Sequence, residues 1–153
     1  MVSTRQTNPG WLGRLLKRYE SGEVLALGWP VGTDKAALRY PDGTSMLTVV
    51  ASNQFGTTNI PQRDFMHPGG LAAFEATRGI REAGVKAVNA GKATPAEVLA
   101  TMGPFAESAL KKTIADFTTP GNAQSTIARK GDDNPLEDTR LMVQSVTHMV
   151  RAK

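Results

Sequence analysis

The apolar positions near the N-terminus follow the spacing of one helix face. Asn8 can cap this helix, Pro9 fits its first turn, and Gly22 stands where a helix commonly ends. Basic residues take the other side of the predicted helix. Five large side chains recur with the helical period and form one stripe: Trp11, Leu12, Leu15, Leu16 and Tyr19.

The pattern then changes to one typical of strands. Glu23–Trp29 is mostly apolar and stops before a proline, and Lys35–Tyr40 is a weaker strand candidate. Ser45–Ser52 is rich in β-branched residues. Between the last two segments, Pro41-Asp42-Gly43 predicts a tight turn, because proline presets φ and glycine accepts a positive φ. We therefore expect a hairpin over roughly 35–52.

Residues 53–70 predict a shaped connection, because they contain two prolines and three glycines. A helix is expected over about 71–90, with apolar positions that include Leu71 and Phe74, and Gly91 should end it.

A second central helix is expected over about 95–117. Thr94 and Glu97 have the spacing of a capping box at its start. Gly103-Pro104 should kink or split it. Its buried face is expected to comprise Phe105, Ala106, Ala109, Leu110, Thr113, Ile114 and Phe117.

Residues 118–138 form an irregular arm, and a structureless stretch of this length inside a compact domain is usually functional or disordered. Ile127 and Leu136 are its candidate anchors. The arm is expected to be disordered in a free monomer and to order on assembly. Thr139–Lys153 predicts a short turn followed by a final strand that closes the sheet.

Together these elements predict a single domain over residues 1–153 of the α+β class. We expect a small, mostly antiparallel sheet packed by an N-terminal helix and two central helices, with long extended loops. The chain has no cysteine, which excludes a disulfide staple and a thiolate metal site. No apolar run approaches the roughly 20 residues of a membrane helix, so no membrane partner is expected.

The formal net charge of +4 leaves a nucleic-acid-binding reading open. Its candidate surface is the basic side of the first helix, which carries Arg14, Lys17 and Arg18. The basic residues are scattered rather than gathered into an arm, so a solvated face or subunit contacts are the alternative.

Catalytic chemistry finds little support in the sequence. His67 and His148 are the only histidines, and neither has a nearby pair of carboxylates that would complete a metal site. Asp132-Asp133 lacks the glycine and ligand rhythm of a calcium loop. We therefore predict no enzyme activity, no cofactor and no metal, and interpret the elaborate loops as surfaces for recognition between proteins.

Two of these loops resemble a known family. Ser52-Asn53-Gln54-Phe55-Gly56-Thr57, followed by Ile60-Pro61-Gln62-Arg63-Asp64-Phe65, resembles the Asn/Glu-Phe-Gly-Thr … Ile-Pro-x-Arg-x-Phe signature of tailed-bacteriophage neck and tail-completion proteins. Ser125-Thr126-Ile127-Ala128-Arg129-Lys130-Gly131, with Asn134-Pro135-Leu136 and Asp138-Thr139 after it, resembles their Thr-Ile-x-x-Lys-Gly … Pro-Leu-x-Asp-Thr-Gly segment. Asp64 stands where that family often has Pro, and Arg140 where it often has Gly.

The resemblance implies a structural subunit of a ring at the phage head–tail joint. Its expected partners are other copies of itself, six or twelve in a ring, with portal or adaptor proteins on one side and tail-tube or terminator proteins on the other. DNA would pass through the lumen without sequence recognition, and the ring would assemble in the host cytoplasm and reside in the virion.

The two loops supply the candidate interface residues. Arg63 can hold carbonyls or a carboxylate, either within its own subunit or across an interface. Charges on the arm can pair head-to-tail around a ring. The candidates are Phe55, Arg63, Phe65, Ile127, Arg129, Lys130, Asp132, Asp133 and Leu136.

Overall fold

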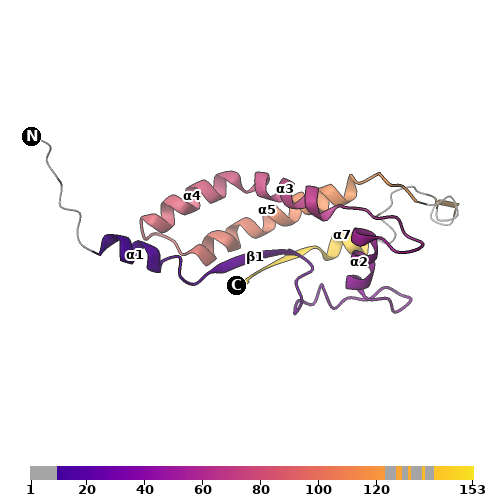
Figure 1. Ribbon diagram of the computed structural model, residues 1–153, viewed down its shortest axis with the longest axis horizontal. Coiled ribbons are helices and arrows are strands. Elements are labelled where there is room, and N and C mark those ends of the chain that lie inside the picture. The colour runs from indigo at the N-terminus through magenta and orange to yellow at the C-terminus, as the bar shows by residue number, and fades with distance from the viewer. Residues whose placement is uncertain (1–9, 123–126, 129–130, 132–135, 137–139) are drawn as a thin grey trace, which may run out of the picture.

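The structure is a computed structural model that describes residues 10–122, 127–128, 131, 136 and 140–153. Its elements run along the chain as Figure 1 shows. In order they are α1 (Trp11–Lys17), β1 (Glu23–Gly28), α2 (Met46–Phe55), α3 (Met66–Ala76), α4 (Arg78–Asn89), α5 (Pro95–Ala115), α7 (Leu141–Ser145) and β2 (Thr147–Ala152).

The body is elongated and has three layers (Figure 1). Helices α3 and α4 follow one another along one side of α5, and the two strands lie along its other side. Strands β1 and β2 pair antiparallel, with Leu27 opposite His148 and Leu25 opposite Val150. The expected α+β class is confirmed. The final strand expected at the C-terminus is β2, and the expected short turn before it is the five-residue helix α7.

The expected hairpin over 35–52 is wrong apart from its turn, because residues 35–40 form turns and a single bridge rather than a strand. The tight turn at 41–43 is present, since the amide of Tyr40 donates to the carbonyl of Thr44 and a single bridge pairs Arg39 with Ser45. From Met46 onward, however, the chain is helix α2, and the Ser45 hydroxyl caps it by accepting from the Thr48 amide at 3.1 Å. Met46 is fully buried, so core packing outweighs the β propensity of the β-branched run.

The expected helix over 71–90 is two helices, and the first begins earlier than predicted. Helix α3 starts at Met66 and carries Pro68 in its first turn, where the amide lost to proline has no intrahelical partner. Thr77 separates α3 from α4, and its buried hydroxyl donates to the carbonyl of Ala73 at 2.9 Å. Gly91 follows the end of α4 with a φ of 72°, as expected for a helix terminator.

Helix α5 begins with the expected capping box, in which Thr94 and Glu97 satisfy each other's amides. It then continues unbroken through Pro104, so the expected split at Gly103-Pro104 is wrong. A proline inside a helix costs about 3 kcal/mol. Packing on both sides of α5 offsets this cost, because α3 and α4 cover one side and both strands cover the other.

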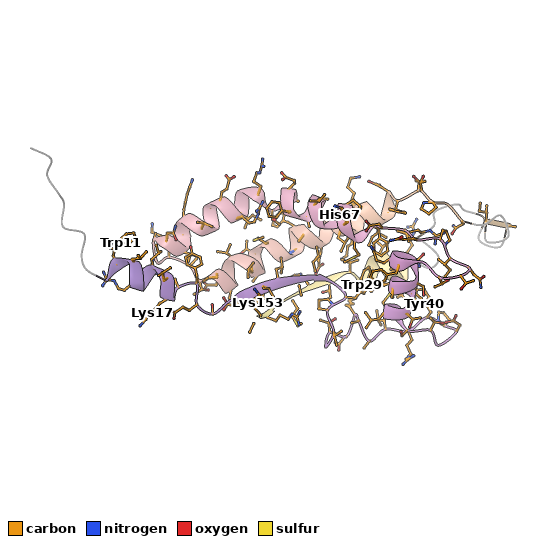
Figure 2. All side chains as sticks on the ribbon, in the orientation of Figure 1. Trp11, Lys17, Trp29, Tyr40, His67 and Lys153 are labelled. Carbon is orange, nitrogen blue, oxygen red and sulfur yellow. The ribbon has the colours of Figure 1, made fainter. Side chains whose placement is uncertain are left out.

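The core lies at the end of the body that holds α2 and α7 (Figure 2, near Trp29). Phe65 is its centre, with Trp29 and Phe117 packed edge-to-face against it at centroid distances of 6.3 and 6.5 Å. The indole of Trp29 donates to the buried Ser145 hydroxyl at 2.7 Å. The polar end of the largest core side chain is therefore satisfied.

Helix α1 lies at the opposite end of the body. It was expected to pack on the sheet, and this expectation is wrong. None of its residues is buried. Gly10 precedes it as the N-cap position, while Asn8 and Pro9, the expected cap and first-turn residues, lie outside the described part of the chain.

The close packing of α5 on β2 is testable at Gly103, where an added Cβ would overlap the His148 ring. Gly103→Ala is expected to lower the free energy of unfolding by about 1–3 kcal/mol, which is typical of overpacking. Gly79→Ala on α4 is the control, because its Cβ meets no atom within 4 Å, and it should gain up to about 1 kcal/mol of helix propensity. Urea denaturation measures both, and equal stabilities would contradict the packing.

A second contact between α5 and β2 makes stability depend on pH. Nδ1 of His148 lies 2.6 Å from the Glu107 carboxylate, and Lys111 lies 3.3 Å from the same group. Burial raises the pKa of Glu107, but hydrogen bonds and charge from His148 and Lys111 outweigh it and leave this pKa below its ordinary value. The carboxylate form is therefore favoured more in the folded than in the unfolded chain.

Folding lowers the pKa of Glu107. Its contribution to the free energy of unfolding is therefore present above the ordinary glutamate pKa and is lost as the pH falls through the lowered value. Glu107→Gln should be less stable than the parent protein at neutral pH, and the difference should shrink on acidification. Chemical denaturation across pH 3–7 checks this; a difference that stays constant over that range would show that Glu107 makes no charge-dependent contribution.

Candidate subunit interface

The first family-like motif forms the connection between α2 and α3. Gly56 ends α2 with a φ of 76°, and an added Cβ would lie 2.9 Å from the Gln62 amide nitrogen. Only glycine fits this position without moving the backbone. The loop then closes on itself, since the amide of Thr57 donates to the carbonyl of Ile60 at 2.8 Å.

Side chains on the two arms of this loop hold one another. The Gln54 amide nitrogen donates to the Asp64 carboxylate at 2.7 Å, and its oxygen accepts from the Met66 amide at 3.1 Å. Asp64 also accepts from the His67 amide in the first turn of α3. These hydrogen bonds lower the pKa of Asp64, that from Gln54 most, followed by that from His67. Asp64 is therefore a carboxylate that braces the start of α3.

Arg63 ties this loop to the beginning of the arm. Its side chain is buried, and its guanidinium donates to the carbonyls of Pro120 at 3.1 Å and Gly121 at 3.0 Å. It also donates to the Asn53 side-chain oxygen at 2.7 Å, and the Arg63 amide donates to the Asn53 carbonyl at 2.7 Å. Of the two roles expected for Arg63, these contacts realise the one within its own subunit.

Two other interface candidates are core residues. Phe65 is fully buried and Leu136 is 4% exposed, and both belong to the core cluster. Neither side chain presents surface to a neighbour in this conformation, and the burial of Leu136 confirms its expected role as an anchor of the arm. Ile127 is half-buried. The remaining candidates, Arg129, Lys130, Asp132 and Asp133, lie outside the described residues.

Phe55 is the candidate that faces outward. It is the last residue of α2 and is 74% exposed. Its side chain is therefore available for contact with another molecule and does not contribute to the core. Phe55 is thus the one residue of the first motif whose large apolar side chain is free to meet a partner.

Several exposed apolar residues were not singled out from the sequence. Phe105 was assigned to the buried face of its helix, yet it is 53% exposed, and Leu71 and Phe74 are also exposed. Ala106, Leu110 and Ile114 are buried as expected, and Met102 extends their row along α5. Their i, i+4 spacing was the signal available in the sequence. Val31, in the loop after β1, is 80% exposed.

The basic residues of α1 are only partly available to a ligand. Arg18 donates to the carbonyls of Val88 at 2.8 Å and Asn89 at 2.6 Å, which satisfies the C-terminal end of α4. This contact removes Arg18 from the surface expected for nucleic acid. Arg14 and Lys17 remain on the exposed helix.

The histidines hold no metal cluster in the described part of the chain. His67 lies exposed in the first turn of α3, not in a loop as expected, and His148 lies on β2 as expected. Among the residues that the structure describes, no three His, Asp or Glu side chains are grouped to bind a metal ion. Within the same residues, every helix is too short or too polar to cross a membrane.

Comparison of the chain with protein-family models, with curated proteins and with solved structures finds no match.

The Arg63 contacts generate a stability prediction. Arg63→Ala should lower the free energy of unfolding by about 3 kcal/mol, because a buried side chain is removed and partly buried carbonyl oxygens lose their donors. Arg63→Lys should recover less than half of this, since an ammonium group cannot present the guanidinium fork. Arg39→Ala is the control: Arg39 is exposed and donates only to the Gly43 carbonyl, so the change should stay within about 0.5 kcal/mol. Thermal and urea unfolding with similar losses for Arg39→Ala and Arg63→Ala would contradict the assigned role.

Proposed function

We propose that this chain is a structural subunit of a ring at the head–tail joint of a tailed bacteriophage, in the neck or in tail completion. The observation that carries the proposal is the amount of large apolar surface left exposed on a small folded body. It is spread over α1, α2, α3, α4, α5 and the loop after β1. Where several lie together, as Trp11, Leu12 and Leu16 do on one short helix, such exposed apolar residues mark a site of protein association.

The geometry of the family-like motifs supports the same proposal. Gly56 stands at a position that requires glycine, and Arg63 ties the motif to the arm that carries the second motif. Arg140, where the family often has Gly, has a φ of 57°, which is the left-handed backbone that glycine favours. The two departures from the family pattern are therefore accommodated locally, at Asp64 by hydrogen bonds and at Arg140 by its backbone.

The proposed work is mechanical. Copies of the chain would close around a channel through which DNA passes, with portal or adaptor proteins on one side and tail-tube or terminator proteins on the other. Free energy of assembly would come from the burial of exposed apolar side chains such as Phe55 and Val31. The proposal involves no catalysis, cofactor or metal.

The test is the mass of the purified protein by light scattering, combined with negative-stain images of the same sample. Closed rings of six or twelve copies are expected. A monomer that binds duplex DNA with a steep salt dependence would instead favour a nucleic-acid-binding module, and Arg14→Ala with Lys17→Ala should then flatten the salt dependence.

Phe55 provides the matching point mutation. Phe55→Ala should change the free energy of unfolding by less than about 0.5 kcal/mol, because the side chain is exposed. It should nevertheless shift rings toward smaller species at the same protein concentration, since truncation of a buried interface aromatic is costly. Leu110→Ala is the contrasting variant, because Leu110 is 1% exposed and its loss should lower stability by about 2–5 kcal/mol. Rings of unchanged size and stability with Phe55→Ala would remove Phe55 from the interface.

A further inference from the structure

Helix α1 is a short amphipathic element that its own subunit leaves uncovered. Trp11, Leu12 and Leu16 are each about half exposed, and no residue of α1 is buried. A helix of seven residues is not stable by itself in water and normally depends on packing of its apolar face. This face therefore lacks a partner within the chain as the structure describes it.

Polar contacts fix where α1 lies. Arg18 donates to the carbonyls of Val88 and Asn89, and the Tyr19 hydroxyl donates to the Asn89 side chain at 2.7 Å. Figures 1 and 2 show the result: α1, with Trp11 and Lys17, projects from one end of the body, far from Trp29. Because it is held beyond the C-terminal end of α4, α1 does not lie along the side of its own α4–α5 pair.

That side carries a groove of matching chemistry, the α4–α5 groove, with a volume of about 440 Å³. Its lining is mostly small or apolar, with Gly79, Ala83, Ala87 and Ala93 among its residues and Val98 packed against Gly84 at the close contact between the helices. A Cβ at Gly79 would meet no atom within 4 Å, so the groove is open there. Ile80 and Val98 are the larger apolar residues of the groove, and most of the rest of its lining is Gly or Ala, whereas α1 carries Trp11, Leu12 and Leu16 exposed.

The charges of the two surfaces are opposite. Within α1 the charged residues are Arg14 and Lys17, both positive, whereas the charged residue that lines the groove is Glu97. Hydrogen bonds from the Thr94 amide and hydroxyl lower the pKa of Glu97, so this carboxylate stays ionised at neutral pH. Of the possible occupants of the groove, a second copy of this chain therefore fits by both size and charge.

We propose that α1 of one copy packs into the α4–α5 groove of a second copy, with Trp11, Leu12 and Leu16 against the small residues and the basic residues toward Glu97. The contact joins two different surfaces, so a dimer still has one free α1 and one free groove. Association therefore continues head-to-tail, into a ring if the rotation between copies closes and into an open filament if it does not. Closure into a phage ring rests on the proposed function, but the pairwise contact does not.

The test uses two variants that each lose one surface. Leu12→Gln with Leu16→Gln removes the apolar face of α1 and leaves the groove intact. Gly79→Arg fills the groove and repels α1, and it meets open space within its own subunit. Gly70→Arg, on α3, also meets open space and adds the same charge outside the groove, so it is the matched control.

Each surface variant alone should lose the association that the parent protein and Gly70→Arg show by light scattering. An equimolar mixture of the two surface variants should form dimers and no larger species, because one working α1 meets one working groove. A mixture that stays monomeric overturns the inference, and so does unimpaired association of either variant alone. Glu97→Gln, which can keep the capping contacts, should weaken the mixed dimer roughly two- to fivefold.

Disulfide trapping identifies the contact independently, because the chain has no cysteine of its own. Leu12→Cys and Ala83→Cys variants should crosslink to each other, whereas Leu12→Cys with Gly70→Cys should not. Crosslinking of Leu12→Cys only to itself would replace the proposed groove with a symmetric α1–α1 contact. Mixed dimers together with open filaments of the parent protein would contradict the phage ring but not the α1–groove contact. Rings without the mixed dimer would contradict the α1–groove contact but not the phage ring.

Discussion

The close approach of neighbouring elements to α5 is the constraint on which the rest of this fold depends. Three glycines create it: an added Cβ at Gly69 would overlap Leu110, one at Gly84 would overlap Val98, and one at Gly103 would overlap the His148 ring. Dispersion contacts over such short separations accumulate along 21 residues of helix. They stabilise α5 across Pro104, and they let a sheet of only two strands persist although an isolated pair is marginal.

The packing around α5 is uneven, and this asymmetry organises the surface. At one end, Phe65 is enclosed by Trp29 and Phe117, and α2 and α7 complete the core. At the other end α4, α5 and α1 meet mainly through small residues and polar contacts, so large apolar side chains remain exposed there. The exposed apolar face of α1 at this end is suited to association end to side, which is how the inferred contact between copies is arranged.

Most residues of the first motif make contacts within the subunit, and one lies exposed at its surface. Arg63, Asp64 and Gln54 hold the loop and connect it to Pro120–Asn122, while Phe65 anchors it in the core. Phe55 is left outside. Most motif residues therefore act by fixing the backbone from which one exposed side chain projects. The motif residues set the local geometry of the loop first. They affect recognition only through that geometry.

Local signals in the sequence determined the elements that depend on neighbouring residues: the capping box at Thr94, the helix end at Gly91, the tight turn at 41–43, the final strand and the α+β class. Tertiary structure alone decided that Ser45–Phe55 is capped helix, that Pro104 does not break α5, and that Phe65 is buried while Phe55 and Phe105 are exposed. The reason is physical. A cap or a turn is set by hydrogen bonds within a few residues, whereas burial depends on which distant side chains fill the same space.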